Sequence, residues 1–456
     1  MDTRGRHRVS TAIVLVFLIG ILTACSAAPA LQSPSGDIAV PPPIATGAPA
    51  ATMAPATGAI PPGAPAGAIH EAPATTEAAV APPAGAVAGA DAPAIQPAPP
   101  RPVQPEQYQA IRAGEIDDNL DVAAYISYLQ NYTGVPALPV DVSERYLLTI
   151  VNERQEPVLD ARVRLYDGER LLFDARTYAG GRVIIFPRAL SVSPNAGTLR
   201  VLVEKGNSVA SSTLQRGPDV ARTIVLAGAE ALPRQPKLDV LFLLDATGSM
   251  GDEINRIQQT ILSIAERIDR FEPHPEVRFG LVAYRDRGDD YVTRIYAEFT
   301  PDVAAFQQAL LAVRADGGGD TPEDLNEALH VALQQMNWAD DAVRLTFLVA
   351  DAPPHLDYGQ QFTYVDAIRV AAARGVKIYP IAASNTDPQA EYVFRQLAQQ
   401  TLARFIFLTY QPGQNGGAPG DTTQMNVDPA AYTVERLDDL IVRMVERELA
   451  EAMGAQ

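Results

Sequence analysis

The second half of this 456-residue chain alternates apolar runs of strand length with segments of helical periodicity. The first run, residues 238–244, is apolar almost throughout, as expected of a strand that is buried on both faces. Strands that alternate with helices are connected by crossovers, so we predict an α/β fold with a doubly wound, mostly parallel sheet. The first helix is marked by isoleucines spaced three and four residues apart, namely Ile254, Ile257, Ile261, Ile264 and Ile268.

The same alternation continues to the end of the chain. We expect the later strands at residues 277–284, 293–299, 345–350, 376–381 and 405–408. We expect helices at residues 301–314 and 322–336, and a closing helix at 434–452. In an open sheet of this kind, ligands bind at the carboxyl edge of the strands.

Residues 145–226, which precede this half, have the sequence pattern of an all-β region. Polar and apolar residues alternate in 146–151 and 161–166, and glycine-containing turns separate the runs. About seven short strands predict a small β-sandwich, which we delimit at 141–232. Residues 156–161 and Gly180-Gly181-Arg182 resemble carboxypeptidase regulatory-like, immunoglobulin-like modules. No chemistry is visible in this region, so we expect a spacer or packing partner, with carbohydrate binding as the alternative.

The first 25 residues have the pattern of an export signal. Three arginines precede a short apolar run at 11–22, which is shorter than the roughly 20 apolar residues of a membrane span. The following Leu-Thr-Ala-Cys resembles the lipobox of bacterial lipoproteins. This resemblance implies a secreted, extracytoplasmic protein, at the cell surface or in the periplasm, that is anchored to a membrane by a lipid on Cys25. The alternative is an ordinary signal peptide with a chance cysteine.

Two further segments connect the signal to the sandwich. Residues 26–105 are mostly Ala, Pro and Gly and cannot bury a core, so we predict a disordered, extended tether. Residues 106–140 regain ordinary composition. Here we expect a short helical segment whose apolar face is formed by Ala123, Tyr125, Ile126 and Leu129.

Composition limits the chemistry that this chain can perform. The net charge of −18 disfavours nucleic acid as a partner and favours cations. A single cysteine excludes an intrachain disulfide and a thiolate metal cluster, and five histidines are few for zinc binding or histidine-based catalysis.

Oxygen-bearing side chains fall at three places on the carboxyl edge of the expected sheet. Asp245, Thr247 and Ser249 directly follow the first strand, Thr321 lies in a glycine-rich loop before a helix, and Asp351 follows the strand that ends at residue 350. Carboxylates and hydroxyls without nitrogen or sulfur favour Mg²⁺, Mn²⁺ or Ca²⁺. The sequence therefore predicts a divalent-cation site at this edge.

The sequence Asp-Ala-Thr-Gly-Ser-Met resembles the Asp-x-Ser-x-Ser motif of the von Willebrand factor type A (VWA) family, with Thr247 at the first serine position. The resemblance covers residues 236–453, within a domain that we delimit at 236–456. It implies a metal-ion-dependent adhesion site (MIDAS) formed by Asp245, Thr247, Ser249, Thr321 and Asp351. It also implies a protein partner that completes the ion with an acidic residue. Asp351 is followed by Ala-Pro-Pro-His, where many family members have glycine.

These observations favour a surface-displayed, lipid-anchored binding or adhesion module that is not an enzyme. A structural envelope scaffold is the alternative. A magnesium-dependent hydrolase is a weaker one, because the sequence shows no Walker loop, no usable Cys or His nucleophile–base pair and no second carboxylate cluster. His355 is expected to be a surface-loop residue near the rim of the site.

Overall fold

The computed structural model describes residues 111–232, 235–252, 254–272, 274–383, 386–409, 425, 427 and 432–454. The lipid-attachment site predicted at Cys25 and the tether predicted at 26–105 lie outside these residues. Among the residues that are described, no helix is both long and apolar enough to cross a membrane.

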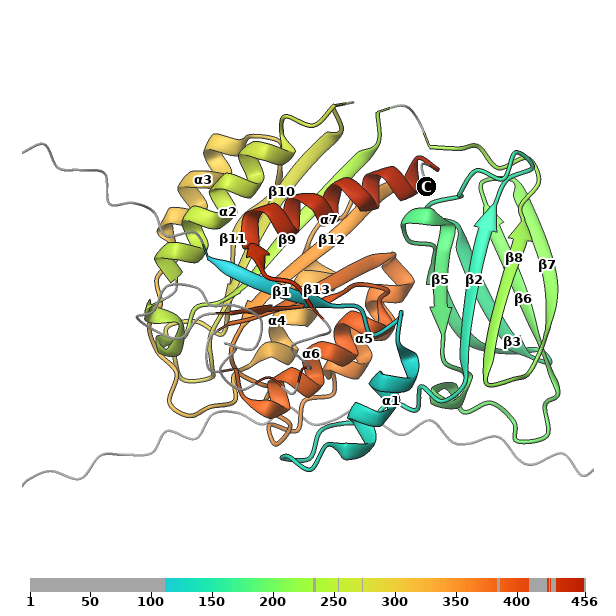
Figure 1. Cartoon of the computed structure of the whole chain (residues 1–456), viewed down its shortest axis with the longest axis horizontal. Coiled ribbons are helices and arrows are strands. Elements are labelled where there is room, and N and C mark those ends of the chain that lie inside the picture. Colours follow the sequence, from blue (N-terminus) through green and yellow to red (C-terminus); the bar gives the residue numbers. More distant parts are fainter. Residues whose placement is uncertain are drawn as a thin grey trace, which may run out of the picture. The chain divides into compact units, whose positions relative to one another are not determined.

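The second half of the chain, together with residues 112–116, forms an eight-stranded sheet with the order β11-β10-β9-β12-β13-β14-β1-β15 (Figure 1). The five strands from β10 to β14 in this order run parallel, and β11 and β1 are antiparallel to their neighbours. The predicted mixed, mostly parallel α/β sheet is therefore confirmed. The strands are β9 (Lys237–Asp245), β10 (Glu276–Tyr284), β11 (Thr293–Thr300), β12 (Ala342–Ala350), β13 (Val376–Ala382), β14 (Phe405–Leu408), β1 (Arg112–Ile116) and β15 (Glu435–Arg436).

Helices cover both faces of this sheet because its central strands are apolar on both sides. In β9, Val240 and Phe242 face one core, whereas Leu241 and Leu243 face the other. The first core includes residues of α2 (Ile254–Ile268), α3 (Val303–Ala312) and α7 (Leu437–Ala452). The second includes α4 (Leu325–His330), which continues as a π-helical turn (Val331–Gln335), α5 (Tyr364–Arg374) and α6 (Pro388–Gln400). The sequence predicted α2, α3, α4 and α7 but not α5 and α6.

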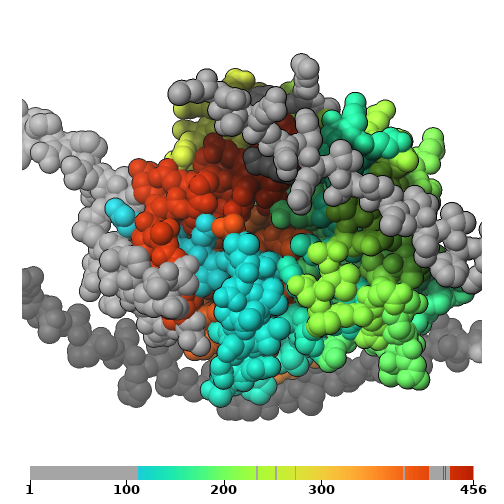
Figure 2. Space-filling view, turned by 45° about the vertical axis from the view of Figure 1, so that its right-hand side comes forward, coloured from blue at the N-terminus to red at the C-terminus, as the bar shows by residue number. Residues whose placement is uncertain are grey.

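The sequence predicted only a helix in the segment at 106–140, whereas the structure contains a helix and a strand there. The helix is present as α1 (Val122–Asn131), with Tyr125 buried but Ala123 exposed. The same segment also supplies β1, which pairs antiparallel with β14 and β15 inside the large sheet. In Figure 2 the cyan surface of this segment lies against the red and orange surface of the C-terminal half. Hydrogen bonds also join the segment to the C-terminal half. Gln389 donates to the carbonyl of Pro136, and Tyr364 donates to the carbonyl of Leu138.

The predicted β-sandwich consists of a three-stranded sheet, β5-β2-β8, and a four-stranded sheet, β4-β3-β6-β7, around a common apolar core (Figure 1). Leu159 and Ala179, both in connections of this region, are buried in the first core of the α/β layer. Sandwich and α/β layer therefore share part of their apolar interior. The strands are β2 (Arg145–Val151), β3 (Arg162–Asp167), β4 (Arg170–Arg176), β5 (Arg182–Ile185), β6 (Thr198–Lys205), β7 (Ser208–Gln215) and β8 (Asp219–Val225), with 3₁₀ turns at Ala179–Gly181 and Pro187–Leu190.

Candidate metal centre

Two of the three predicted ligand loops begin at adjacent strand ends. β9 ends at Asp245 and leads into a 3₁₀ turn (Gly248–Asp252), and β12 ends one residue before Asp351. The parallel register pairs Val349 with Leu244, so both acidic residues reach the same edge of the sheet. The topology thus places the loops where open α/β sheets bind ligands.

Four of the five predicted ligands form one chain of hydrogen bonds. Oδ1 of Asp245 accepts from the backbone N–H of Thr247 at 3.0 Å and from its hydroxyl at 2.6 Å. The Thr247 and Ser249 hydroxyl oxygens are 3.2 Å apart, and Ser249 donates to Oδ1 of Asp351 at 3.1 Å. Asp245, Thr247, Ser249 and Asp351 are therefore brought together as a compact set of oxygen donors.

Thr321, the fifth predicted ligand, lies in an exposed loop beside this set. The loop is held near the first one because the N–H of Gly248 donates to the carbonyl of Gly317 at 3.0 Å. A Cβ on Gly318, which has a φ of +75°, would lie only 3.4 Å from Cβ of Thr247. In the described part of the chain, no hydrogen bond joins Thr321 to the other four residues, so its ligand role stays a prediction.

This set contains two carboxylates, the fully buried one of Asp245 and the partly buried one of Asp351. Burial, and then the charge of Asp351, raises the pKa of Asp245 to about 7. Burial likewise raises the pKa of Asp351. No Lys or Arg forms an ion pair with either within the described residues. The nearby Arg285 instead donates to the carbonyls of Ala246 and Arg314. A bound cation would supply the positive charge that these carboxylates lack.

The sequence analysis missed Glu323, which the structure adds to this acidic group. Glu323 is 2 % exposed, and its Oε2 has no hydrogen-bond partner among the described residues. Burial raises its pKa to about 9, with further contributions from Asp245, Asp286, Asp289 and Asp351. Its position two residues after Thr321 was the only signal in the sequence, and a glutamate near a helix start is too common to be diagnostic.

The expectation for His355 is wrong, because this side chain is not at the surface. It is only 4 % exposed, and the ring of Tyr358 stacks on its imidazole with 3.8 Å between centroids. The sequence shows only a histidine after two prolines in a loop, which gives no indication that an aromatic side chain three residues later would cover it.

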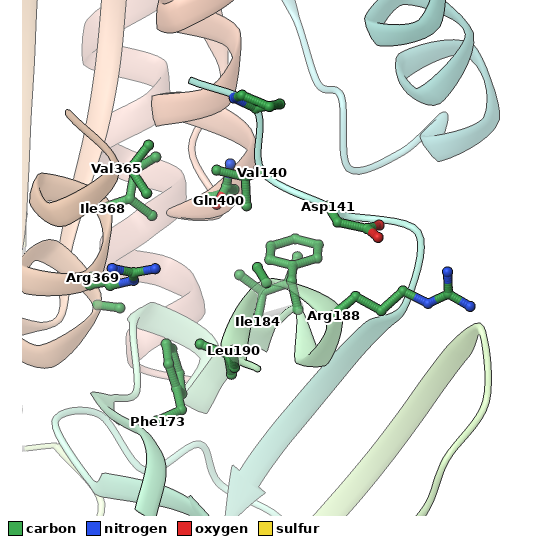
Figure 3. Close-up of a pocket in the computed structure, with 14 residues that line it drawn as sticks. Val140, Asp141, Phe173, Ile184, Arg188, Leu190, Val365, Ile368, Arg369 and Gln400 are labelled. Atoms are coloured by element: carbon green, nitrogen blue, oxygen red, sulfur yellow. The ribbon is translucent and has the colours of Figure 1, made fainter. Parts of the chain in front are cut away.

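The structure also contains an apolar cavity of about 270 Å³ away from these loops (Figure 3). Phe173 and Ile184 of the sandwich line it together with Val365 and Ile368 of α5. None of the predicted ligands reaches it. The cavity belongs to the seam between the sandwich and the α/β layer.

Comparison with known proteins agrees with this geometry. Residues 239–409 match the von Willebrand factor A domain family. An alpha-protein kinase, vwkA, of Dictyostelium discoideum is 29 % identical over 170 residues, which are 37 % of this chain and 27 % of that protein. Human von Willebrand factor A domain-containing protein 7 is 35 % identical over 119 residues, which are 26 % of this chain and 12 % of that protein.

The chain thus spans about a quarter or less of the length of these relatives. Among solved structures, the conserved hypothetical protein BatB from Bacteroides thetaiotaomicron aligns with 12 % identity and a TM-score of 0.31, covering 46 % of this chain and 98 % of its own. The family match and the mixed, mostly parallel sheet covered by helices on both faces show that the C-terminal half of this chain contains a von Willebrand factor A domain.

Proposed function

We propose that this protein is a binding module whose VWA domain holds Mg²⁺, or alternatively Mn²⁺ or Ca²⁺, and binds a protein partner through that ion. The main support is a pair of carboxylates, the buried Asp245 and the partly buried Asp351, that two hydroxyls connect and no cationic side chain neutralises in the described structure. Oxygen donors of this kind suit hard divalent cations. Thr321 would add a further hydroxyl from its neighbouring loop.

The donor set also suits recognition of an acidic side chain. Three of the five proposed ligands are hydroxyls and carry no charge, so the bound ion would keep an attraction for an external carboxylate. Ser249 and Thr321 are exposed, whereas Asp245 is fully buried. The ion would therefore be held from below by the strand ends and be open to a partner on its outer side.

The remaining assignments extend this proposal to the whole chain. We propose that the protein is secreted, that a lipid on Cys25 anchors it to a membrane, and that residues 26–105 serve as a tether. We propose a binding role and no catalysis. The alternative, a scaffold that holds envelope components together, predicts partner binding that survives removal of divalent cations by EDTA.

The proposal predicts that cations stabilise the wild-type chain and not Asp245→Asn. At a cation concentration about 100 times its dissociation constant, the free energy of unfolding should rise by about 2.7 kcal/mol. Asparagine keeps the size of the side chain but removes the charge that the ion needs. The measurement is thermal unfolding of the full chain during Mg²⁺ and Mn²⁺ titrations, with calorimetry to detect weak binding.

Asp269→Asn provides the matched control, because Asp269 is an exposed acid remote from the ligand loops in sequence. It should respond to Mg²⁺ as the wild type does. Equal stabilisation of wild type and Asp245→Asn, or a wild type that binds no cation in calorimetry, would contradict the proposed site.

The raised pKa values predict an unusual pH dependence in the absence of cations. Asp245 and Glu323 have ordinary pKa values of 3.8 and 4.5 but about 7 and 9 in the folded chain. Between the ordinary and the raised pKa values, the folded state binds more protons than the unfolded state. The stability that these two protonated carboxyls contribute is therefore full below about pH 4 and is lost as the pH rises to 9. Saturating Mg²⁺ should oppose this loss, and its affinity should fall up to about tenfold per pH unit below pH 7.

Thermal unfolding at pH 5, 7 and 9, in EDTA and in Mg²⁺, tests this prediction. Glu323→Gln should flatten the EDTA profile, because glutamine does not titrate. An EDTA profile that is the same in wild type and Glu323→Gln would show that the glutamate does not hold its proton in the folded state.

A further inference from the structure

A second group of potential metal ligands lies beside the first and includes none of its five predicted residues. Asp286 follows β10, Asp320 precedes Thr321 in the glycine-rich loop, and His355 follows Asp351 by four residues. One ligand atom from each lies within 4.8 Å of the other two. Nε2 of His355 is 3.7 Å from Oδ1 of Asp286 and 3.8 Å from Oδ1 of Asp320. No sequence motif indicates this cluster, because its members are more than 30 residues apart.

The imidazole of His355 is oriented as a metal ligand would be. Its Nδ1 is 2.7 Å from Oδ1 of Asp357, so the proton on Nδ1 is donated to that carboxylate. In its neutral form the ring then presents the lone pair of Nε2 to the carboxylates of Asp286 and Asp320. Nε2 is buried and has no hydrogen-bond partner within the described residues. Acceptors that face one another in this way need a cation between them.

A protonated imidazolium between the carboxylates is the competing explanation. Its Nε2–H would then donate to Asp286 or Asp320, but both distances exceed the roughly 3.2 Å limit of a good N–H···O bond. Metal bonds of about 2.0–2.2 Å separate neighbouring ligand atoms by roughly 3–3.5 Å. The two separations measured from Nε2 of His355 are therefore a few tenths of an ångström longer than those of a metal site.

Two of the three side chains are already fixed in position. Tyr358 donates its hydroxyl to the carboxylate of Asp286, at 2.8 and 2.7 Å from its two oxygens, and stacks on the imidazole of His355. The carboxylate of Asp357 fixes the ring from the opposite nitrogen. Asp320 is 63 % exposed and can move the small distance that closure requires.

We propose that Asp286, Asp320 and His355 form a second metal site that takes a divalent transition-metal ion such as Zn²⁺. An imidazole nitrogen with two carboxylates favours these ions over Mg²⁺ and Ca²⁺, in contrast to the all-oxygen donor set around Asp245. Because the described residues supply three protein ligands, at least one coordination position would be open to water or an external ligand. Asp357 acts as a positioning residue through the other nitrogen of the ring.

Co²⁺ is the probe for this site, since its visible ligand-field absorption reports on the ligands that surround it. The full chain is titrated with Co²⁺ in excess Mg²⁺, and we expect saturation with a single class of site in competition with Zn²⁺. Asp320→Asn and His355→Gln should each weaken Co²⁺ binding at least tenfold. Asp357→Asn should weaken it by about 10- to 100-fold.

The controls separate this site from the proposed MIDAS. His330→Gln removes another histidine with an acidic neighbour, Glu327 at 3.4 Å, and should leave Co²⁺ binding unchanged. Asp245→Asn should abolish stabilisation by Mg²⁺ but retain the Co²⁺ signal, so failure of one site is distinguishable from failure of the other. Asp320 is exposed, which makes Asp320→Asn a test that does not disturb folding.

Two results would overturn the second site. One is a Co²⁺ affinity that Asp320→Asn and His355→Gln leave unchanged, which would leave His355 as an imidazolium in an ion-pair network. The other is a Co²⁺ signal that disappears only in Asp245→Asn, which would place the ion at the first site.

Discussion

A chain that begins at residue 236 will not fold cooperatively, although the sequence delimits the VWA domain there. The large sheet is incomplete without β1, whose backbone pairs with β14 on one side and β15 on the other. Ile111 and Ala113 are also buried in the first core. Their removal exposes the edge of β14 and leaves its hydrogen-bonding groups without protein partners.

The truncation would also remove the acidic partner of Arg344 and one of the two acidic partners of Arg395, which keeps Glu391 at 3.4 Å. Arg395 pairs with Asp118 through contacts of 2.5 and 3.0 Å, and Arg344 pairs with Asp160 through contacts of 2.8 and 3.1 Å. The side chains of all four are at most 6 % exposed. Loss of one partner of a buried pair costs about 3–5 kcal/mol, and the total stability of a domain is about 5–15 kcal/mol. The two losses together are comparable with the whole stability.

Thermal unfolding followed by circular dichroism tests this prediction on chains that comprise residues 236–456 and 106–456. The longer chain retains both ion pairs and β1, and we expect it to melt in one sharp transition. A sharp transition of the shorter chain within a few degrees of the longer one would show that β1 and the sandwich contribute little to the folded VWA domain.

Lys377→Met should have the largest effect of any single substitution considered, a loss of about 3–5 kcal/mol in the free energy of unfolding. Nζ of Lys377 lies 2.6 Å from Oε1 of Glu448, and both side chains are 2 % exposed. The hydroxyl of Tyr379 donates to the same oxygen at 2.7 Å. Burial raises the pKa of Glu448, but the Lys377 ammonium outweighs this effect and holds the pKa below its usual value. Methionine would leave this carboxylate buried without its cation.

A double-mutant cycle in urea distinguishes the buried charge from lost packing. Lys377→Met combined with Glu448→Gln should recover much of the stability, because no uncompensated carboxylate remains. The matched control is Arg154→Met, which breaks an exposed pair with Glu156 and should cost less than about 1 kcal/mol. A double variant no more stable than Lys377→Met alone would show that the charge is not the cause.

Much of the α/β layer follows from local sequence patterns. The isoleucines of α2 and the apolar run of β9 predict their own structures, because 3.6-residue and two-residue periodicities are properties of helix and strand geometry. Parallel strands end at a common edge, so the sequence also indicated that Asp245 and Asp351 would lie together. The grouping of these two acidic residues with Thr247 and Ser249 could therefore be predicted without information about distant contacts.

The tertiary structure decided the features that depend on partners far away in sequence. β1 has five residues, Arg-Ala-Gly-Glu-Ile, without alternation, and it is a strand because β14 and β15 provide hydrogen-bonding edges. Burial of Glu323 and His355 likewise depends on the loops that cover them. The cluster of Asp286, Asp320 and His355 exists only because three separate loops meet at one edge. Periodicity determines each element on its own, whereas pairing, burial and the grouping of ligands are set by the packing of the whole chain.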